Sequence, residues 1–239
     1  MLLKEGYARK DNQEETMPSK LLTLFWEPSA TFRSLKVKTN WSDIVIPLLI
    51  VTIVSLILTP YIVPIAMTEQ KVRIKSSERL ADIQKETIIE RMESKADSPV
   101  QYITTAVAII VKTLVLAAVM LFIGNFLLGG ETKYKTMLGV TAYVGLVDVV
   151  SLGIKTPLII SQGSTKIYTS LALLFEESSS FMFRFMTNID AFALWKIVLF
   201  SIALGVIIDK KASKPFGIII VIWLLYAVVA ALLAGFAKI

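Results

Sequence analysis

Three charged side chains lie well inside long apolar stretches of the chain: Lys112, Asp148 and Lys196. A single charge at the centre of a bilayer costs at least about 2.5–3.5 kcal/mol on insertion scales, so an ion pair is the expected arrangement. At about 1.5 Å of rise per helical residue, Lys112 and Asp148 fall at similar depths, and Lys196 falls nearer the outer surface. The sequence therefore predicts an intramembrane polar site built on a Lys112–Asp148 pair.

This polar site has two interpretations. The functional one is a pathway for protons or a substrate, because charged residues within membrane spans often mark such routes. The structural one is an ion pair that holds helices together, with lysine stems that can also reach toward the interface. A single pair without a run of further polar residues favours the structural role.

Few residues remain for enzymatic chemistry. The chain has no cysteine and no histidine, which excludes thiol nucleophiles, disulfides, imidazole acid–base catalysis and zinc sites built from those ligands. An intramembrane aspartyl protease needs two deep aspartates, and here only Asp148 lies deep. Ser151 and Lys155 have the spacing of a Ser–Lys dyad, but such spacing is frequent by chance. We therefore expect no enzyme, no cofactor and no metal site.

The elements that carry these residues are membrane spans. The chain has 239 residues, is 55% hydrophobic and has a mean hydropathy of +0.68. A helix needs about 20 mostly apolar residues to cross the hydrocarbon core. Five stretches meet this requirement: 44–67, 100–128, 136–160, 189–208 and 216–237. The predicted fold is an all-α polytopic membrane protein, a bundle of five transmembrane helices.

Three segments flank or interrupt the membrane domain, 41–239. Residues 1–20 mix charges and predict a mobile cytoplasmic tail. Residues 21–40 combine apolar and aromatic residues with basic ones, which predicts an amphipathic helix in the membrane interface rather than a solvated linker. The loop 68–98 interleaves acids and bases, so it predicts an extramembrane helical segment held by charge pairs.

The fourth span opens with a short motif of Asp190, Phe192 and Trp195. An aspartate at this place can cap the first turn of a helix and favours the positive end of its dipole. The two aromatic residues are typical of the belt at a membrane surface. Lys196, one residue further on, is predicted to reach outward to the interface or to turn inward toward Asp148.

The last span carries small residues at i, i+4 and i+8: Ala227, Ala231 and Gly235. Small side chains allow the backbones of two helices to approach closely. The stripe is therefore a predicted helix-contact surface, and together with the charged loop it is a candidate surface for another membrane protein or for self-association.

The placement of lysines predicts the orientation of the chain. The tight turns after the second and fourth spans are basic, whereas the bases of the loop 68–98 are matched by acids. With five spans, this pattern places the N-terminus in the cytoplasm and the C-terminus outside. The formal charge of +6 then reflects orientation and anionic lipid headgroups. No nucleic-acid-binding motif accompanies the charge, so no nucleic acid partner is expected.

Three stretches of the chain resemble segments that occur in the same order in a known protein family. They are "LFWEPSATFRSLKVKTNW" before the first span, "LLGGETKYKTMLGVTAY" between the second and third, and "NIDAFALWKIVLFSIALGVIIDKKASK" over the fourth. With five spans around them, they resemble the Yip1 family nearly throughout. One departure is Ala191, where the family often has proline, and another is the length of the charged loop. The resemblance implies no established catalytic residues.

The many lysines and isoleucines and the absence of cysteine resemble bacterial members of that family. Some bacterial relatives are associated with ABC-type exporters and with resistance to toxic peptides. The resemblance therefore implies a protein of the cell membrane that is an accessory or scaffold subunit of a membrane complex. The alternative is a small permease, or a channel for ions or protons, that uses Lys112, Asp148 and Lys196.

Overall fold

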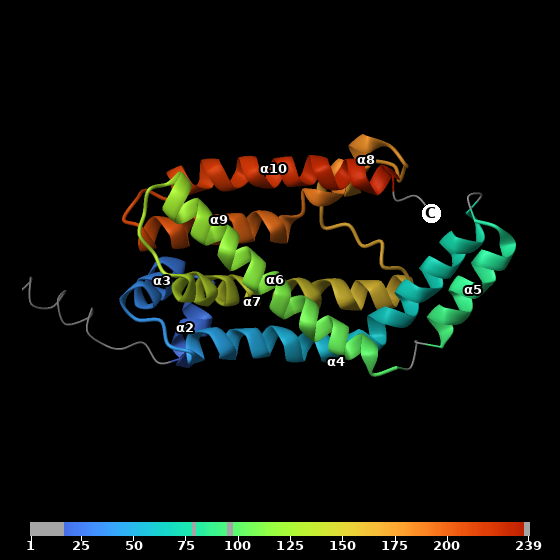
Figure 1. Ribbon diagram of the computed structural model, residues 1–239, viewed down its shortest axis with the longest axis horizontal. Helices are drawn as coiled ribbons and strands as arrows, with labels where there is room; N and C mark the ends of the chain where they lie inside the picture. Colours follow the sequence, from blue (N-terminus) through green and yellow to red (C-terminus); the bar gives the residue numbers. More distant parts are fainter. Residues whose placement is uncertain (1–16, 78–79, 95–97, 237–239) are drawn as a thin grey trace, which may run out of the picture.

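The computed structural model describes residues 17–77, 80–94 and 98–236. Most of the predicted N-terminal tail, 1–16, lies outside these residues. The described part is a bundle of helices (Figure 1) with one isolated β-bridge, between Ser170 and Asp190. The helices are α2 (Met17–Thr23), α3 (Pro28–Val37), α4 (Ser42–Lys75), α5 (Asp82–Glu93), α6 (Val100–Phe122) with the π-turn η1 (Ile123–Leu127), α7 (Tyr134–Gln162), the 3-10 turn η2 (Leu171–Leu174), α8 (Phe181–Asn188), α9 (Ala191–Ile207) and α10 (Ser213–Phe236).

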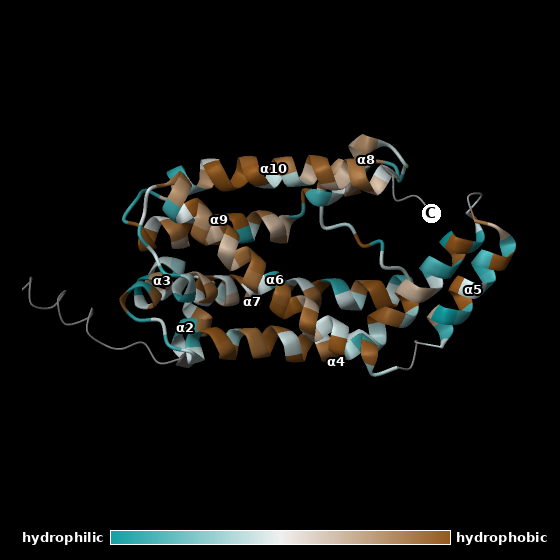
Figure 2. Cartoon of the chain, in the orientation of Figure 1, coloured by the Kyte–Doolittle hydropathy of each residue, from teal (hydrophilic) through white to brown (hydrophobic). Residues whose placement is uncertain are grey.

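Four helices in the described part are long and apolar enough to cross a membrane: α4, α6 with η1, α7 and α10. They follow the long axis of the molecule, except that α6 crosses obliquely (Figure 1). Apolar residues dominate their middle parts, and polar residues gather in α5 and in the turns (Figure 2). The predicted span 189–208 forms α9, which has 17 residues. The sequence thus predicted five spans, and four helices reach spanning length.

The core is centred on α7, which packs against α4, α6 and α9. Its buried side chains include Val140, Tyr143, Val144 and Val147. The adjoining α9 contributes Leu204, which is fully buried. Because every residue from Met137 to Val144 is buried, α7 is enclosed on all sides there and forms the centre of the bundle.

The segment 21–40 contains the end of α2 and the whole of α3, where the sequence predicted a single helix. Leu24, Phe32 and Leu35 are fully buried in the bundle, and α3 packs against α7 and α9. Pro28 suits the first turn of α3 because that position needs no backbone N–H donor. The protein itself therefore covers part of the apolar surface of this segment, whereas Leu22, Trp26 and Val37 stay exposed.

The ends of the bundle differ in their elements. One end holds α2, α3 and the tight turns before α7 and α10, and the other holds α5, α8 and the C-terminal end of α10 (Figure 1). At the second end Glu69 of α4 accepts hydrogen bonds from Ser164 Oγ at 2.6 Å and from the Thr165 backbone N–H at 3.0 Å. Lys71 and Glu93 form an ion pair at 2.8 Å that joins α4 to α5.

Candidate functional site

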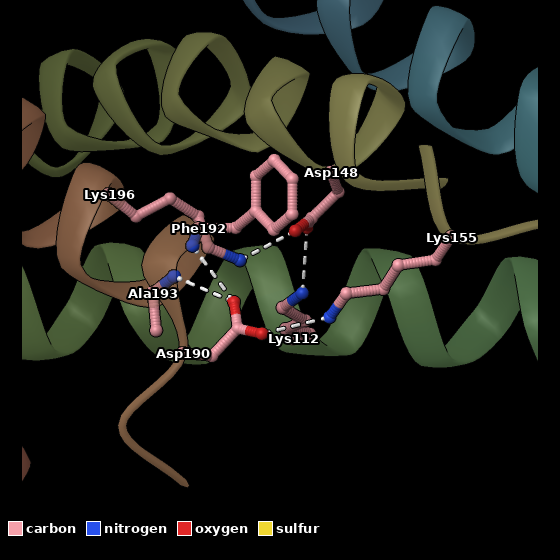
Figure 3. A network of polar contacts seen from close by, with 7 residues as sticks. All are labelled: Lys112, Asp148, Lys155, Asp190, Phe192, Ala193 and Lys196. Atoms are coloured by element: carbon pink, nitrogen blue, oxygen red, sulfur yellow. Dashed lines mark hydrogen bonds and ion pairs between the residues drawn. The ribbon is translucent and has the colours of Figure 1, made fainter. Parts of the chain in front are cut away.

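Asp148 lies at the middle of α7 and binds one lysine on each carboxylate oxygen. Lys196 Nζ, from α9, is 2.6 Å from Oδ1, and Lys112 Nζ, from α6, is 2.9 Å from Oδ2 (Figure 3). The side chain of Asp148 is 24% exposed, whereas that of Lys112 is 53% exposed. One carboxylate therefore connects three helices, with Lys196 more enclosed than Lys112.

The levels of Lys112 and Asp148 follow from helix length. Asp148 lies 14 residues from the start of α7, and Lys112 lies 15 residues from the end of η1. At about 1.5 Å per residue, both are about 21–23 Å from the same end of the bundle. The sequence predicted this agreement in depth, and the structure brings the two side chains into contact.

Lys196 contacts Asp148, although its place near the start of the predicted span 189–208 put it at a different depth. The reason is that α9 begins well short of the ends of α7 and α10 that lie near α8 and the C-terminus (Figure 1). A residue only six positions into α9 is therefore already within reach of Asp148. The prediction that Lys196 could turn inward describes the observed contact.

Asp190 is the second carboxylate of the network. Its Oδ1 accepts hydrogen bonds from the backbone N–H of Phe192 at 2.9 Å and of Ala193 at 3.3 Å, so Asp190 caps α9. Its Oδ2 accepts from Lys155 Nζ at 3.0 Å and from the Thr169 hydroxyl. Figure 3 shows Lys155 reaching from α7 to this carboxylate beside the Asp148 group.

The aromatic residues of the α9 motif pack inside the protein. Phe192 is buried in the core, and its ring centroid is 5.4 Å from Lys155 Nζ. The ring of Trp195 meets that of Phe25 edge-on, with centroids 5.8 Å apart. Because the start of α9 lies inside the bundle, these rings contact protein where the sequence predicted a belt at the membrane surface.

The network consists of three lysines and two aspartates, with a formal charge of +1. All four carboxylate oxygens accept at least one hydrogen bond. Lys155, which has the spacing of a Ser–Lys dyad with Ser151, forms an ion pair with Asp190. The three ion pairs that join α6, α7 and α9 can fix the relative positions of these helices.

Sequence reasoning missed the contact of Lys155 and Thr169 with Asp190. Both partners lie more than 20 residues from Asp190 in the sequence. Thr169 reaches it because the segment after α7 returns to the start of α9, where Leu171 N–H also donates to the Ile189 carbonyl at 3.0 Å. The one available signal was the helical spacing of Asp148 and Lys155, which places both on the same face of α7.

The described residues contain no cluster of three or more acidic side chains that could hold a metal ion. The comparison with protein families gives one clear result: the family model of the Yip1 domain matches residues 22–234. The chain belongs to the Yip1 domain family. Neither the curated proteins nor the solved structures gave a match.

The match includes every residue of the charged network and nearly the whole of each long apolar helix. Membership of the Yip1 family and four helices of spanning length identify a multi-pass membrane protein. Lys112 and Asp148 lie in helices long enough to cross a membrane, and Lys196 reaches Asp148 from the shorter apolar helix α9. In a membrane an unpaired charge is costly, which gives the observed pairing a physical reason.

The stripe of small residues on α10 also packs within the chain. Ala227 and Ala231 are fully buried, and a Cβ added at Gly235 would lie 2.8 Å from Arg184 Nη2 of α8. Helix α10 packs against α8 and α9. The stripe thus makes a close helix contact, but inside this chain, so it does not supply a free surface for a partner.

Replacing Asp190 with alanine is expected to lower the thermal stability of the purified protein. The change removes an N-cap, which contributes about 0.5–2 kcal/mol, and leaves Lys155 without its carboxylate. Asp190→Asn keeps a capping oxygen and should cost less. The melting temperature in detergent measures the effect of both substitutions. The matched control is Ser180→Ala, which changes the N-cap residue of the short helix α8. Equal melting temperatures for wild type and Asp190→Ala would contradict this role.

Proposed function

We propose that this Yip1-family chain is a non-enzymatic accessory or scaffold subunit of a membrane complex in the cell membrane. The main support is the arrangement at Asp148, whose two oxygens are each occupied by a lysine from a different helix. Such a clamp holds α6 and α9 against α7 and gives the bundle one fixed shape. A fixed bundle suits a protein that positions other proteins.

In this proposal α9 is the fifth membrane crossing. Its 17 residues extend about 25 Å at 1.5 Å per residue, against about 30 Å for the hydrocarbon core. The segment 163–190 covers its start and completes the crossing. Five crossings place the termini on opposite sides of the membrane.

The distribution of charge supports a cytoplasmic N-terminus. Among the described residues, the end that holds α2 and α3 has nine basic residues and four acidic ones. The basic residues are Lys20, Arg33, Lys36, Lys38, Lys133, Lys135, Lys210, Lys211 and Lys214, and the acidic ones are Glu27, Asp43, Glu131 and Asp209. An excess of lysine and arginine in short turns favours the cytoplasmic side. Exposed Trp26 and Trp41 at this end support an interfacial position for residues 21–40.

The surface proposed for a partner is the charged hairpin of α4 and α5. Helix α5 has no buried residue, it extends away from the bundle (Figure 1), and its Ile83 is 79% exposed. An apolar side chain on such a helix can anchor a partner protein, with the surrounding charges selecting it. From the family resemblance, an ABC-type exporter involved in toxic-peptide resistance is the partner we propose to test first.

Photo-crosslinking in native membranes tests this function. A crosslinking residue placed at Ile83 should join the chain to one partner protein, and the same residue at Val72, exposed on α4, should join it to the same partner. The matched control is Leu225, exposed on α10, which is expected to face lipid. Purification in mild detergent should then recover the partner in a fixed ratio. A lone oligomer without crosslinks from α5 would contradict the proposal.

A second candidate function, a small permease or channel, has one observation in its favour. Lys112 is half-exposed although it lies at the middle of its helix, and the irregular segment 163–180 runs close to the network. Irregular backbone at membrane depth is found where it is buried in protein or lines a water-filled cavity. In this alternative Lys112, Asp148 and Lys196 would lie along an ion or proton pathway, which measurements of flux can detect.

A further inference from the structure

A pocket of about 480 Å³ lies at the lysine-rich end of the bundle. It is formed by the end of α3, the turn before α7, the first residues of α7 and the last residue of α9. Charged side chains from these elements line it: Lys36, Lys38, Lys133, Lys135 and Glu131. The pocket is separate from the network at Asp148, which lies about 21 Å further along α7.

The positive charge of this pocket is only partly neutralised. Lys36 is 2.5 Å from Asp209 Oδ1 and donates to the Val206 carbonyl at 3.1 Å. Lys38, Lys133 and Lys135, in contrast, have no acidic partner within 4.0 Å among residues 17–77, 80–94 and 98–236. With Glu131 as the one acid in the lining, the pocket keeps a surplus of positive charge and is open to an anion.

The remaining lining suits an oxygen-rich anion. Thr39, Thr132 and Thr136 line the pocket. The Thr39 hydroxyl donates to the Leu35 carbonyl at 2.7 Å, so the hydroxyls of Thr132 and Thr136 are those that can donate to phosphate oxygens.

Helix α7 begins at this pocket, at Tyr134. The Thr136 and Met137 N–H groups donate to the Lys133 carbonyl, so those of Tyr134 and Lys135 are the first-turn donors without a partner within the helix. These donors supplement the lysines, which bind phosphate as compact charges.

Aromatic and apolar side chains place the pocket at the level of lipid headgroups. The ring of Trp41, which is 65% exposed, lies 5.0 Å from Lys135 Nζ. Exposed tryptophan at the start of a spanning helix is typical of the interface between headgroups and hydrocarbon. Val37, on the pocket wall, is also largely exposed and offers an apolar surface beside the charged one.

We propose that this pocket binds the phosphate group of an anionic phospholipid. The lysines and threonines would hold the headgroup, and the apolar surface around Val37 and Trp41 would meet the start of the acyl chains. Basic pockets at the membrane surface bind anionic lipids in this way. The lipid would connect α3, α7 and α9 at the end of the bundle where the tight turns lie.

Lipid binding by the full-length protein in detergent tests the proposal. The probes are short-chain phosphatidylglycerol, short-chain phosphatidylcholine and inorganic phosphate, followed by native mass spectrometry and by the shift in melting temperature. The test variant is Lys38→Gln with Lys133→Gln. The control is Lys211→Gln with Lys214→Gln, which removes the same charge at the same end of the bundle but outside the pocket lining.

We expect wild type and control to bind phosphatidylglycerol alike. The pocket variant should bind it about thirtyfold more weakly, a factor of about five for each lysine that contacts the headgroup. Phosphatidylcholine should bind weakly to all three proteins. Equal weakening in the pocket variant and the control would overturn the pocket in favour of a general surface charge. Displacement of the lipid by micromolar inorganic phosphate would overturn the assignment to a lipid. Melting temperatures without lipid show whether each variant is folded.

Discussion

Replacement of Asp148 with leucine is expected to destabilise the protein more than any other single substitution in the charged network. The change leaves Lys196 enclosed between helices and Lys112 at mid-helix, both without their counter-charge. Removing one member of a buried ion pair costs about 3–5 kcal/mol, because the remaining charge stays in surroundings of low polarity. The melting temperature in detergent and the yield of protein from membranes should both fall.

Two further variants separate charge from packing at this site. Lys112→Leu alone should lower the stability less than Asp148→Leu, since the Lys112 side chain is 53% exposed and Asp148 keeps its ion pair with Lys196. The combined variant Lys112→Met, Asp148→Leu and Lys196→Met should regain most of the lost stability, because well-packed apolar residues can replace a buried ion triad without loss. A combined variant as unstable as Asp148→Leu would contradict the assignment of the loss to unpaired charge.

Gly205→Ala is expected to be the second damaging substitution. A Cβ at this position of α9 would lie 2.8 Å from the Lys210 carbonyl oxygen and 3.1 Å from Ala212 Cα. Both are backbone atoms of the tight turn before α10, and the Lys210 N–H donates to the Gly205 carbonyl at 2.8 Å. The backbone of the turn cannot move aside as a flexible side chain could. The added methyl group should therefore lower the free energy of unfolding by about 1–3 kcal/mol.

Gly153→Ala is the matched control for this substitution. Gly153 lies in α7, and a Cβ there would meet nothing within 4 Å. An alanine should therefore raise helix stability by up to about 1 kcal/mol. Melting temperatures should move in opposite directions for the two variants. A fall of equal size in both would show that the response belongs to glycine replacement in general and not to the turn at Lys210.

Features set by local sequence could be predicted. The helical nature of the chain, the positions of the long spans and the cap at Asp190 follow from apolar length and from capping chemistry. The common depth of Lys112 and Asp148 also follows from residue counting, because α6 and α7 are joined by a tight turn. In that turn Gly129 has a φ of 62°, which the glycine pair in the sequence indicated.

Features set by the path of an irregular segment could not be predicted. The inward position of Lys196 and the Lys155–Asp190 pair both depend on where α9 begins, and that depends on how the segment 163–190 returns into the bundle. The burial of Phe32 and Leu35 depends similarly on α3 packing against α9. Hydrophobic patterning indicates that such residues are shielded from water, but it does not show whether lipid or protein shields them.

Proton flux into liposomes is the most direct test of the claim that the Asp148 network is a structural clamp. Wild type and the combined Lys112→Met, Asp148→Leu, Lys196→Met variant are reconstituted around a pH-sensitive dye, and flux is measured under an imposed pH gradient and potential. We predict that both preparations show the flux of protein-free liposomes. A wild-type flux above that level, lost in a combined variant that still folds, would contradict the clamp and establish a proton pathway through these three side chains.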